Sequence, residues 1–406
     1  MTQVVVVGAG QAGLAVVARL RADGFEGRVT LIGAEPHPPY QRPPLSKGYL
    51  LGEIDRERLY LRPEGFYGEQ GIDLRLGAEV AAIDTGRREV QLVTGAAVPY
   101  DELVLTTGST PRRLPAAIGG ELDGVLVMRD VTDADRLAPE IGPDRAPGRR
   151  ALVVGGGYIG LEAAAVCAKR GLEVTLVEMA PRILQRVAAP ETSDYFRALH
   201  QGHGVRILEG VGLERLLGEG RVTGARLSDG TELACDLVLV GVGIQPNVRL
   251  AESAGIAVEN GIKVDAFGRT SAPHVWAAGD CASFPHGEGL MRLESVGHAI
   301  DQAEAVARNI MGADQPYVPQ PWFWSDQYDT KLQIAGLGQG YDRIHVRESG
   351  DARSHWYYKG DRLLAVDAMN DSRAYMIGKR LIEAGRSPAP EVVTDPGTDL
   401  KALLRG

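Results

Sequence analysis

Apolar residues in this chain form short continuous runs, and each run is followed by a stretch with helical spacing. Val4–Val7 is a β-branched run typical of a buried strand, and Leu14, Val17 and Leu20 then follow the period of a helix. A second strand is expected at residues 28–33. The pattern predicts a strand, a helix and a second strand at the start of the chain.

The same order of elements returns 147 residues later. A strand is expected at 152–154, a helix at 161–170 and a second strand at 173–178. Further along each copy, the run 103–108 resembles the run 237–242. The repeat predicts two similar nucleotide-binding domains of the α/β class, each with a parallel sheet.

Each copy carries a glycine-rich turn between its first strand and its helix. In a βαβ unit the first glycine permits the tight turn, the second lets the backbone approach a pyrophosphate, and the third lets helix and strand pack closely. A single copy is equally compatible with an ordinary glycine turn, but two copies in the same context favour two dinucleotide sites. The residues are Gly8, Gly10 and Gly13 in the first turn, and Gly155, Gly157, Tyr158, Ile159 and Gly160 in the second.

Acidic residues after the second strands help to assign the ligands. Glu178 lies 18 residues beyond Gly160 at a strand end, where a carboxylate accepts hydrogen bonds from an adenosine ribose and repels a 2′-phosphate. This position favours NADH over NADPH at the second site. In the first copy the nearest acid is Glu35, which comes later and is equally explained as a solvated loop charge.

A third segment, 270–280, indicates a flavin at the first site. It reads as a strand that ends in Gly279 and Asp280, where a carboxylate can hold the ribityl hydroxyls of FAD. Thr107 and Gly108 end the other strand expected beside the flavin. The alternative reading of Gly279 and Asp280 is a plain turn at a strand end.

Composition narrows the class of protein. The length of 406 residues suggests two or three domains, and 52 glycines are roughly twice the usual share. A net charge of −9 argues against a general nucleic-acid binder or a protein of anionic membranes. No apolar run approaches the roughly 18 residues of a membrane span, and the start of the chain shows no basic leader.

The cysteines point to a reducing compartment. Cys167, Cys235 and Cys281 are far apart, so they form no CxxC pair, no disulfide framework and no zinc-ligand spacing. We therefore expect a cytoplasmic protein without a metal site.

Four longer motifs carry a resemblance to a known family. Together with the two glycine turns, they resemble the FAD- and NAD-dependent ferredoxin reductases that serve bacterial haem-thiolate monooxygenases and ring-hydroxylating dioxygenases. The resemblance covers nearly the whole chain. The motifs are PYQRPPLSK at 39–47, VGGGYIGLE around 153–162, RLESV at 292–296 and PWFWSDQY at 321–328.

The resemblance implies three domains. A discontinuous FAD-binding domain would comprise residues 1–110 and 242–314, with an NAD-binding domain at 111–241 inserted into it. A carboxy-terminal α+β domain would cover 315–406. Hydrophobic periodicity places its strands near 332–335, 343–347, 355–358 and 363–367, and a helix at 372–383.

Site residues also follow from the resemblance. Lys47 would lie near flavin N5 and pair with Glu162 of the first turn of the NAD-domain helix. Alternatively, Lys47 is a surface loop cation and Glu162 is a helix-start acid favoured by the dipole. Backbone amides after Ser295 would face the N1–C2 edge of the flavin. The family often has an acid at the position of Ala34, which makes the contact from Glu35 the least secure. The residues expected around FAD are Ala12, Arg42, Lys47, Val80, Arg129, Asp280, Val296 and Trp324.

The implied function is an NADH-dependent ferredoxin reductase that passes electrons singly from FAD to a 2Fe-2S ferredoxin. The loop 40–51 lacks the cysteine that related oxidases and peroxidases carry near this lysine, which favours an external electron carrier. The alternatives are an NADH:rubredoxin reductase, an NADH oxidase, and a non-enzymatic interaction protein like apoptosis-inducing factor. Basic candidates for an acidic partner are Arg308, Lys331, Arg373, Lys379 and Arg380.

Overall fold

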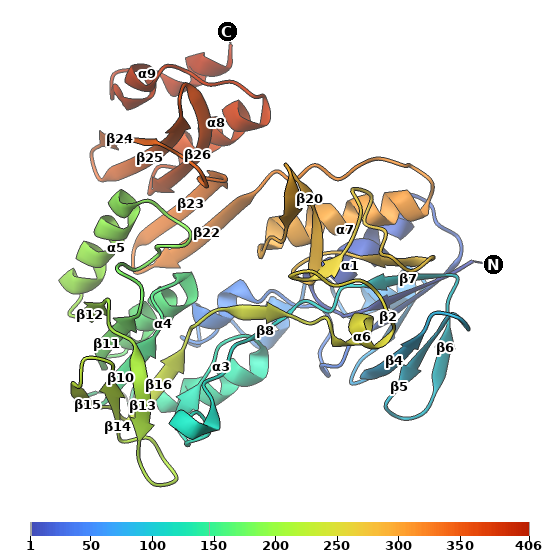
Figure 1. The fold of residues 1–406 in the computed structure, drawn as a ribbon, viewed down its shortest axis with the longest axis horizontal. Helices are drawn as coiled ribbons and strands as arrows, with labels where there is room; N and C mark the ends of the chain where they lie inside the picture. The colour runs from blue at the N-terminus through green and yellow to red at the C-terminus, as the bar shows by residue number, and fades with distance from the viewer. Residues whose placement is uncertain (1, 146, 406) are drawn as a thin grey trace. The chain divides into compact units, whose positions relative to one another are not determined.

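The computed structural model describes residues 2–145 and 147–405 and divides them into two compact units (Figure 1). The first unit comprises the described residues of Met1–Gln41, Arg56–Thr110 and Gln245–Pro321. The second comprises those of Arg42–Asp55, Pro111–Ile244 and Trp322–Gly406. The segment Arg42–Asp55, expected in the flavin domain, therefore packs with the second unit, which also combines the expected NAD-binding and carboxy-terminal domains.

The first unit is built on a parallel sheet with the strand order β19-β7-β1-β2-β3. The apolar run of β1 forms the centre, where Val5 pairs with Thr30 on one side and Leu103 on the other. Helices α1 and α7 pack against each other (Figure 1). The bounds are β1 Gln3–Val7, α1 Gln11–Ala22, β2 Arg28–Ile32, β3 Ile72–Arg75, β7 Glu102–Leu105, β19 Val275–Ala277 and α7 Val296–Ile310.

Smaller elements complete the first unit. Strands β4, β5 and β6 form an antiparallel sheet, and β18, β20 and β21 form a mixed sheet in which β18 runs parallel and β21 antiparallel to β20. Strands β8 and β17 lie where the chain changes unit. The bounds are α2 Gly65–Glu69, β4 Val80–Asp84, β5 Glu89–Leu92, β6 Ala97–Pro99, β8 Ser109–Pro111, β17 Ile244–Pro246, α6 Arg249–Ser253, β18 Ile262–Lys263, β20 Ala282–His286 and β21 Gly289–Met291.

The second unit repeats the parallel arrangement with the order β12-β11-β10-β16-β9. Its central strand β10 pairs with β11 and β16, so the predicted repeat of strand, helix and strand is confirmed. The bounds are β9 Val125–Leu126, α3 Val131–Leu137, β10 Arg150–Val154, α4 Tyr158–Lys169, β11 Glu173–Glu178, α5 Pro190–Gly202, β12 Arg206–Glu209, β13 Leu213–Leu217, β14 Gly224–Leu227, β15 Glu232–Ala234 and β16 Leu237–Val240.

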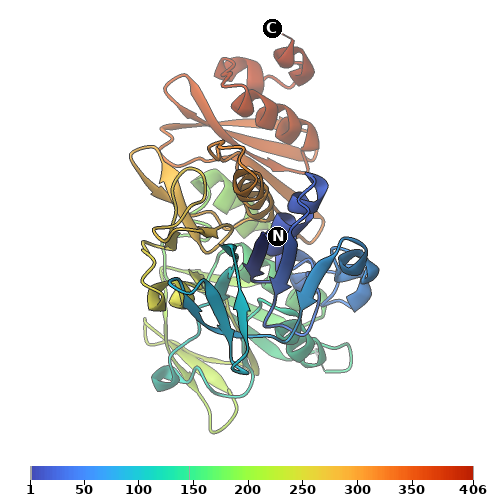
Figure 2. The same ribbon diagram turned by 90° about the vertical axis from the view of Figure 1, so that its right-hand side faces the viewer.

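The carboxy-terminal part of this unit is an antiparallel sheet with the order β22-β23-β26-β25-β24 and α8 against one face (Figure 2). The four predicted strands and the helix are confirmed. Strand β22, whose residues carry the motif at 321–328, was not among the predicted strands. The bounds are β22 Trp322–Gln327, β23 Thr330–Gly336, β24 Arg343–Ser349, β25 Ala352–Lys359, β26 Arg362–Met369, α8 Ser372–Glu383 and α9 Pro390–Thr394.

A buried polar cluster joins the start of α5 to the carboxy-terminal sheet. The Thr192 hydroxyl donates to Asp367 at 2.8 Å, and Tyr357 also donates to this carboxylate. His355 Nδ1 lies 2.7 Å from Thr192 Oγ1, and the amide of Ala189 donates to the Tyr357 hydroxyl at 2.9 Å. Because buried polar groups need partners, this cluster ties the two parts of the second unit together.

Candidate functional site

The first glycine turn contains a space that the protein itself does not fill. A Cβ atom added to Gly8 would lie 2.1 Å from the Thr106 carbonyl oxygen, and one added to Gly13 would lie 2.0 Å from the Gly8 oxygen. A Cβ on Gly10 would meet no atom within 4 Å. The outer glycines are therefore required by internal packing, whereas the central glycine borders open space.

The second turn has the same distribution. A Cβ on Gly155 would lie 2.4 Å from the Gly241 oxygen and one on Gly160 would lie 2.0 Å from the Gly155 oxygen, but nothing lies within 4 Å of one on Gly157. Gly10 and Gly157 are the N-caps of α1 and α4, and among the described residues neither helix has a side chain that caps it. Open space at uncapped helix amides fits a pyrophosphate at each turn.

Glu178 reinforces the second turn from within. Its carboxylate accepts hydrogen bonds from the amides of Gly156 and Ala180, each at 2.7 Å. A carboxylate accepts about four hydrogen bonds, so these two leave capacity for ribose hydroxyls. Tyr158 begins α4, and the neighbouring Ile159 side chain is 46% exposed beside the turn.

Several residues expected around the flavin lie in the first unit. Asp280 follows β19 and accepts a hydrogen bond from Ser109 at 2.8 Å, and Gly279 adopts a φ of +82° that favours glycine. Ala12 lies close by, because a Cβ on Gly279 would be 3.0 Å from the Ala12 Cβ. Thr107 donates to the Asn247 carbonyl at 2.6 Å, and Gly108 has a φ of +66°.

Other first-unit candidates occupy separate places. Val80 is buried at the start of β4, and Glu35 accepts a hydrogen bond from Tyr40 at 2.5 Å. Val296 is the first residue of α7, and Ser295 caps this helix by accepting from the His298 amide. The amides that follow Ser295 are therefore the first amides of a helix.

The remaining candidates, Arg42, Lys47, Arg129, Glu162 and Trp324, belong to the second unit. Lys47 and Glu162 form an ion pair with the Nζ and Oε1 atoms 2.8 Å apart. Glu162 lies in the second turn of α4 and its side chain is 3% exposed. Both the expected place of Glu162 in the first turn and its alternative reading as a helix-start acid favoured by the dipole are therefore wrong.

Sequence reasoning missed the residues that support this pair. Ser46 donates to Glu162 Oε2 at 2.6 Å and Ser325 donates to Glu162 Oε1 at 2.7 Å. Ser46 adjoins Lys47 within the motif at 39–47, which was a usable signal. Arg42 donates to the Arg129 carbonyl at 3.1 Å, so these two candidates also lie together.

The aromatic residues of β22 divide between the two faces of the strand. Phe323 packs on Tyr158 of α4 with 4.7 Å between ring centroids. Trp322 and Trp324 lie on the other face, because alternate residues share a face, and their rings stack at 5.5 Å. Lys379 of α8 lies over the Trp322 ring. These contacts give Trp322 and Phe323 packing roles.

The cysteines are free and buried, and all three lie in the described part of the chain. Burial raises the pKa of Cys167 and of Cys235 to about 12, and it also raises the pKa of Cys281. None of these thiols is poised to form the thiolate that disulfide exchange requires.

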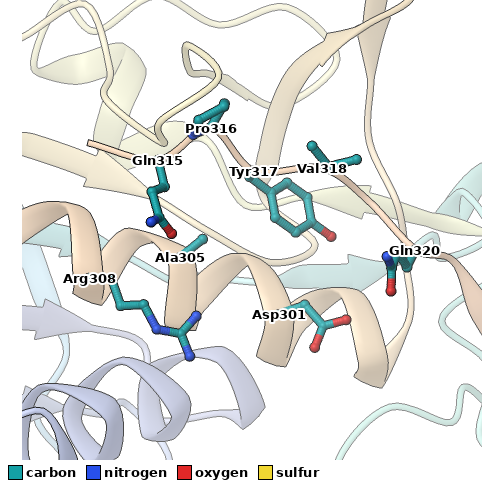
Figure 3. Close-up of a pocket in the computed structure, with 8 residues that line it drawn as sticks. All are labelled: Asp301, Ala305, Arg308, Gln315, Pro316, Tyr317, Val318 and Gln320. Atoms are coloured by element: carbon teal, nitrogen blue, oxygen red, sulfur yellow. The ribbon is translucent and has the colours of Figure 1, made fainter. Parts of the chain in front are cut away.

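Further features of the described residues carry no chemistry of their own. Figure 3 shows a groove between α7 and the segment that follows it. Within 2–145 and 147–405, no cluster of His, Cys, Asp and Glu is arranged for a metal, and no helix has the length and apolarity of a membrane span. The groove is lined by Asp301, Ala305, Arg308, Gln315, Pro316, Tyr317, Val318 and Gln320.

Comparison with known proteins places this site in a family. Residues 2–303 match the family model described as pyridine nucleotide-disulphide oxidoreductase, and residues 322–404 match one described as reductase C-terminal. A ferredoxin–NAD(P)(+) reductase from Sphingomonas sp. is 44% identical over 99% of this chain and 97% of its own length. Rhodocoxin reductase from Rhodococcus erythropolis is 40% identical over 99% and 94%.

Solved structures agree with these matches. Putidaredoxin reductase, in its covalent complex with putidaredoxin, superposes with a TM-score of 0.94 and 40% identity over 100% of this chain and 98% of its own. A ferredoxin reductase from Rhodopseudomonas palustris also gives 0.94, with 42% identity over 99% of both chains. The chain therefore belongs to the pyridine nucleotide-disulphide oxidoreductase family, in the branch that contains these ferredoxin reductases.

Proposed function

We propose that this protein is an NADH-dependent ferredoxin reductase that transfers hydride from NADH to FAD and then passes single electrons to a 2Fe-2S ferredoxin. Relatives of this kind serve oxygenases, among them the ferredoxin–NAD(+) reductase component of the p-cumate 2,3-dioxygenase system. The ferredoxin of the present chain would feed a haem-thiolate monooxygenase or a ring-hydroxylating dioxygenase. We place the protein in the cytoplasm, where its free cysteines would stay reduced.

The residues present fit the two nucleotides. Gly10 and Gly157 leave room for a pyrophosphate at each helix start, and Asp280 offers a carboxylate for ribityl hydroxyls. Glu178 discriminates against a 2′-phosphate by charge. When bound, FAD supplies the conversion between a two-electron donor and a one-electron acceptor.

The protein's own part in the hydride step would be orientation and exclusion of water. Glu162 holds the Lys47 side chain in one position. Because the ammonium is already ordered before the nucleotides react, it can orient the nicotinamide and flavin rings. The amides at the start of α7, shaped by the Ser295 cap, would stabilise negative charge on the pyrimidine edge of the flavin. Trp324 would contact the flavin from the carboxy-terminal sheet.

One observation favours an external carrier over thiol chemistry: all three cysteines are buried, with pKa values that burial raises. A disulfide reductase of this fold needs reactive thiols beside the flavin. The loop 40–51, which carries Lys47, contains no cysteine. This supports electron transfer to another protein.

The test is NADH oxidation by the purified flavoprotein with different acceptors. We expect fast turnover with 2Fe-2S ferredoxins, slow turnover with rubredoxin and little oxygen uptake without a carrier. Equal turnover with oxygen alone would support an oxidase, and slow turnover with every carrier would support an interaction protein. Repeating the assay with NADPH tests Glu178, whose assignment fails if the two nucleotides react equally well.

A further inference from the structure

A chain of buried hydrogen bonds leads from Glu162 through the interior of the second unit. Ser325 Oγ donates to Glu162 Oε1 at 2.7 Å, and Gln327 Nε2 donates to Ser325 Oγ at 3.1 Å. The Gln327 Oε1 atom lies 2.8 Å from His200 Nε2, and the Tyr328 hydroxyl lies 3.3 Å from His200 Nδ1. The chain connects α4, β22 and α5.

We propose that Ser325, Gln327 and His200 are positioning residues for the hydride step, because they fix the Glu162 carboxylate and through it the Lys47 ammonium. This proposal rests on the role of Lys47 and Glu162 proposed above. It assigns a task to three residues that touch neither nucleotide in the expected site.

The direction of every hydrogen bond in the chain follows from chemistry. A carboxylate only accepts, so the single hydroxyl proton of Ser325 goes to Glu162 and its oxygen accepts from Gln327. If the Gln327 amide were flipped, its oxygen would face the Ser325 oxygen, whose only hydrogen is already donated to Glu162. Two acceptors would then face each other, so the flipped orientation is excluded. Gln327 Oε1 therefore accepts a hydrogen bond from the His200 Nε2–H group.

The state of His200 agrees with this assignment. Burial lowers its pKa to about 4, so the ring is neutral near pH 7. With its proton on Nε2, the Nδ1 atom accepts from the Tyr328 hydroxyl. Each donor from Tyr328 to Ser325 thus points toward Glu162, and aligned hydrogen bonds strengthen one another.

Burial favours a single arrangement of these hydrogen bonds. Ser325, Gln327 and His200 are fully buried, and Glu162 is almost so. A broken link would leave a buried polar group without a partner, which is costly. Because alternate residues of β22 face the same side, Ser325 and Gln327 are presented together toward α4 and α5.

The carboxylate is held at both ends. Ser46 donates to Oε2, while Ser325 and Lys47 both contact Oε1. Ser46 therefore fixes the Oε2 atom, and Ser325 fixes the Oε1 atom that pairs with the Lys47 ammonium. Loss of Ser325 would free Oε1 to move, and Lys47 would move with it.

The experiment compares FAD-loaded variants by two measurements. Stopped-flow absorbance gives the rate of flavin reduction by NADH, and acylation of Lys47 by an amine reagent, followed by mass spectrometry, reports how firmly the amine is held. Ser325→Ala removes the contact, Gln327→Met cuts the chain one step behind it, and Ser325→Thr restores a hydroxyl. Ser354→Ala is the control, since Ser354 is an equally buried serine of the same sheet that bonds elsewhere.

We expect the rate of flavin reduction to fall about tenfold in Ser325→Ala and about threefold in Gln327→Met, because small misplacements of reacting groups slow a reaction. Lys47 should be acylated faster in both, and Ser325→Thr and Ser354→Ala should resemble the wild type. If either Ser325→Ala or Gln327→Met fails to fold, the other carries the test. Wild-type reduction and acylation rates in the folded variants would overturn the proposal.

Glu162→Gln separates this proposal from the proposed function. If it slows flavin reduction while Ser325→Ala and Gln327→Met match Ser354→Ala, the chain has no positioning role. If Glu162→Gln itself leaves flavin reduction unchanged, the function assigned to the Lys47 pair is wrong. The role of these residues in the hydride step then falls as well, and Lys47 acylation shows separately whether Ser325 holds the ammonium: faster labelling in Ser325→Ala shows that it does, and unchanged labelling shows that it does not.

Discussion

At the scale of single residues, Lys47 and Glu162 are unequal partners, since the lysine side chain is 19% exposed and the glutamate 3%. Removing one member of such a pair leaves a buried charge without its counterion, which costs about 3–5 kcal/mol. An exposed pair such as Lys263 with Glu259 contributes about 0–1 kcal/mol. The two lysines are therefore expected to behave differently.

Lys47→Ala should lower the free energy of unfolding by several kcal/mol and slow flavin reduction by NADH roughly 100-fold, because the reacting rings lose their orientation. Urea denaturation and stopped-flow absorbance measure the two effects. Lys263→Ala is the matched control and should change neither by much. An unchanged rate of flavin reduction in Lys47→Ala would remove this residue from the catalytic site.

The glycine turns allow binding and folding to be separated at neighbouring positions. Gly157→Ala should leave the free energy of unfolding within about 0.5 kcal/mol, since its Cβ meets open space, but should raise KM for NADH. Gly160→Ala should destabilise the protein by about 1–3 kcal/mol, because its Cβ overlaps the Gly155 oxygen. Denaturation and steady-state kinetics of the two variants check both statements, and an unchanged KM in Gly157→Ala would contradict a pyrophosphate there.

At the scale of elements, α7 begins with a cap whose loss can be measured. Ser295→Ala removes the acceptor for the His298 amide and should cost about 1 kcal/mol of stability. It should also weaken FAD retention, because the first amides of α7 would lose their fixed direction. Flavin release followed by fluorescence checks this, with Ser295→Asp expected to restore the cap and Val296→Ile expected to change little.

The elements that could be predicted from the sequence are those in which the pattern of apolar residues alone indicates a strand or a helix. The apolar run of β1 predicts a strand and the periodic apolar residues of α8 predict a helix. Helix α8 has the predicted bounds, Ser372–Glu383. Strand β22 has no such signal, because its buried face combines Phe323 with Ser325 and Gln327. For the same reason the hydrogen bonds that Ser325 and Gln327 contribute around Glu162 could not be predicted from the sequence. These polar residues become partners only after β22, α4 and α5 have packed.

At the scale of the whole molecule, the buried cluster around Asp367 makes the stability of the second unit depend on pH. Burial raises the pKa of Asp367 to about 6, so between pH 4 and pH 6 the folded chain binds this proton more firmly than the unfolded chain. The contribution of Asp367 to stability therefore falls as pH rises through this range. Burial lowers the pKa of His355 to about 3, which acts in the opposite direction.

Asp367→Asn isolates the contribution of the carboxyl group, since the amide oxygen can accept from Thr192 and Tyr357 while His355 is retained. We expect the variant to gain stability relative to the wild type as pH rises from 4 to 7. Thermal unfolding across this pH range measures the difference. Parallel curves for the two proteins would show that Asp367 does not titrate there.

The position of β19 in the chain has a consequence for synthesis. Val275–Ala277 pairs with β7, so the parallel sheet of the first unit lacks an edge strand until residue 277 has left the ribosome. The sheet that contains β10 draws all its strands from residues 125–240 and is available earlier. We therefore expect nascent chains to complete the sheet encoded in the middle of the message first, and a fragment that ends at residue 110 to be recovered as an aggregate.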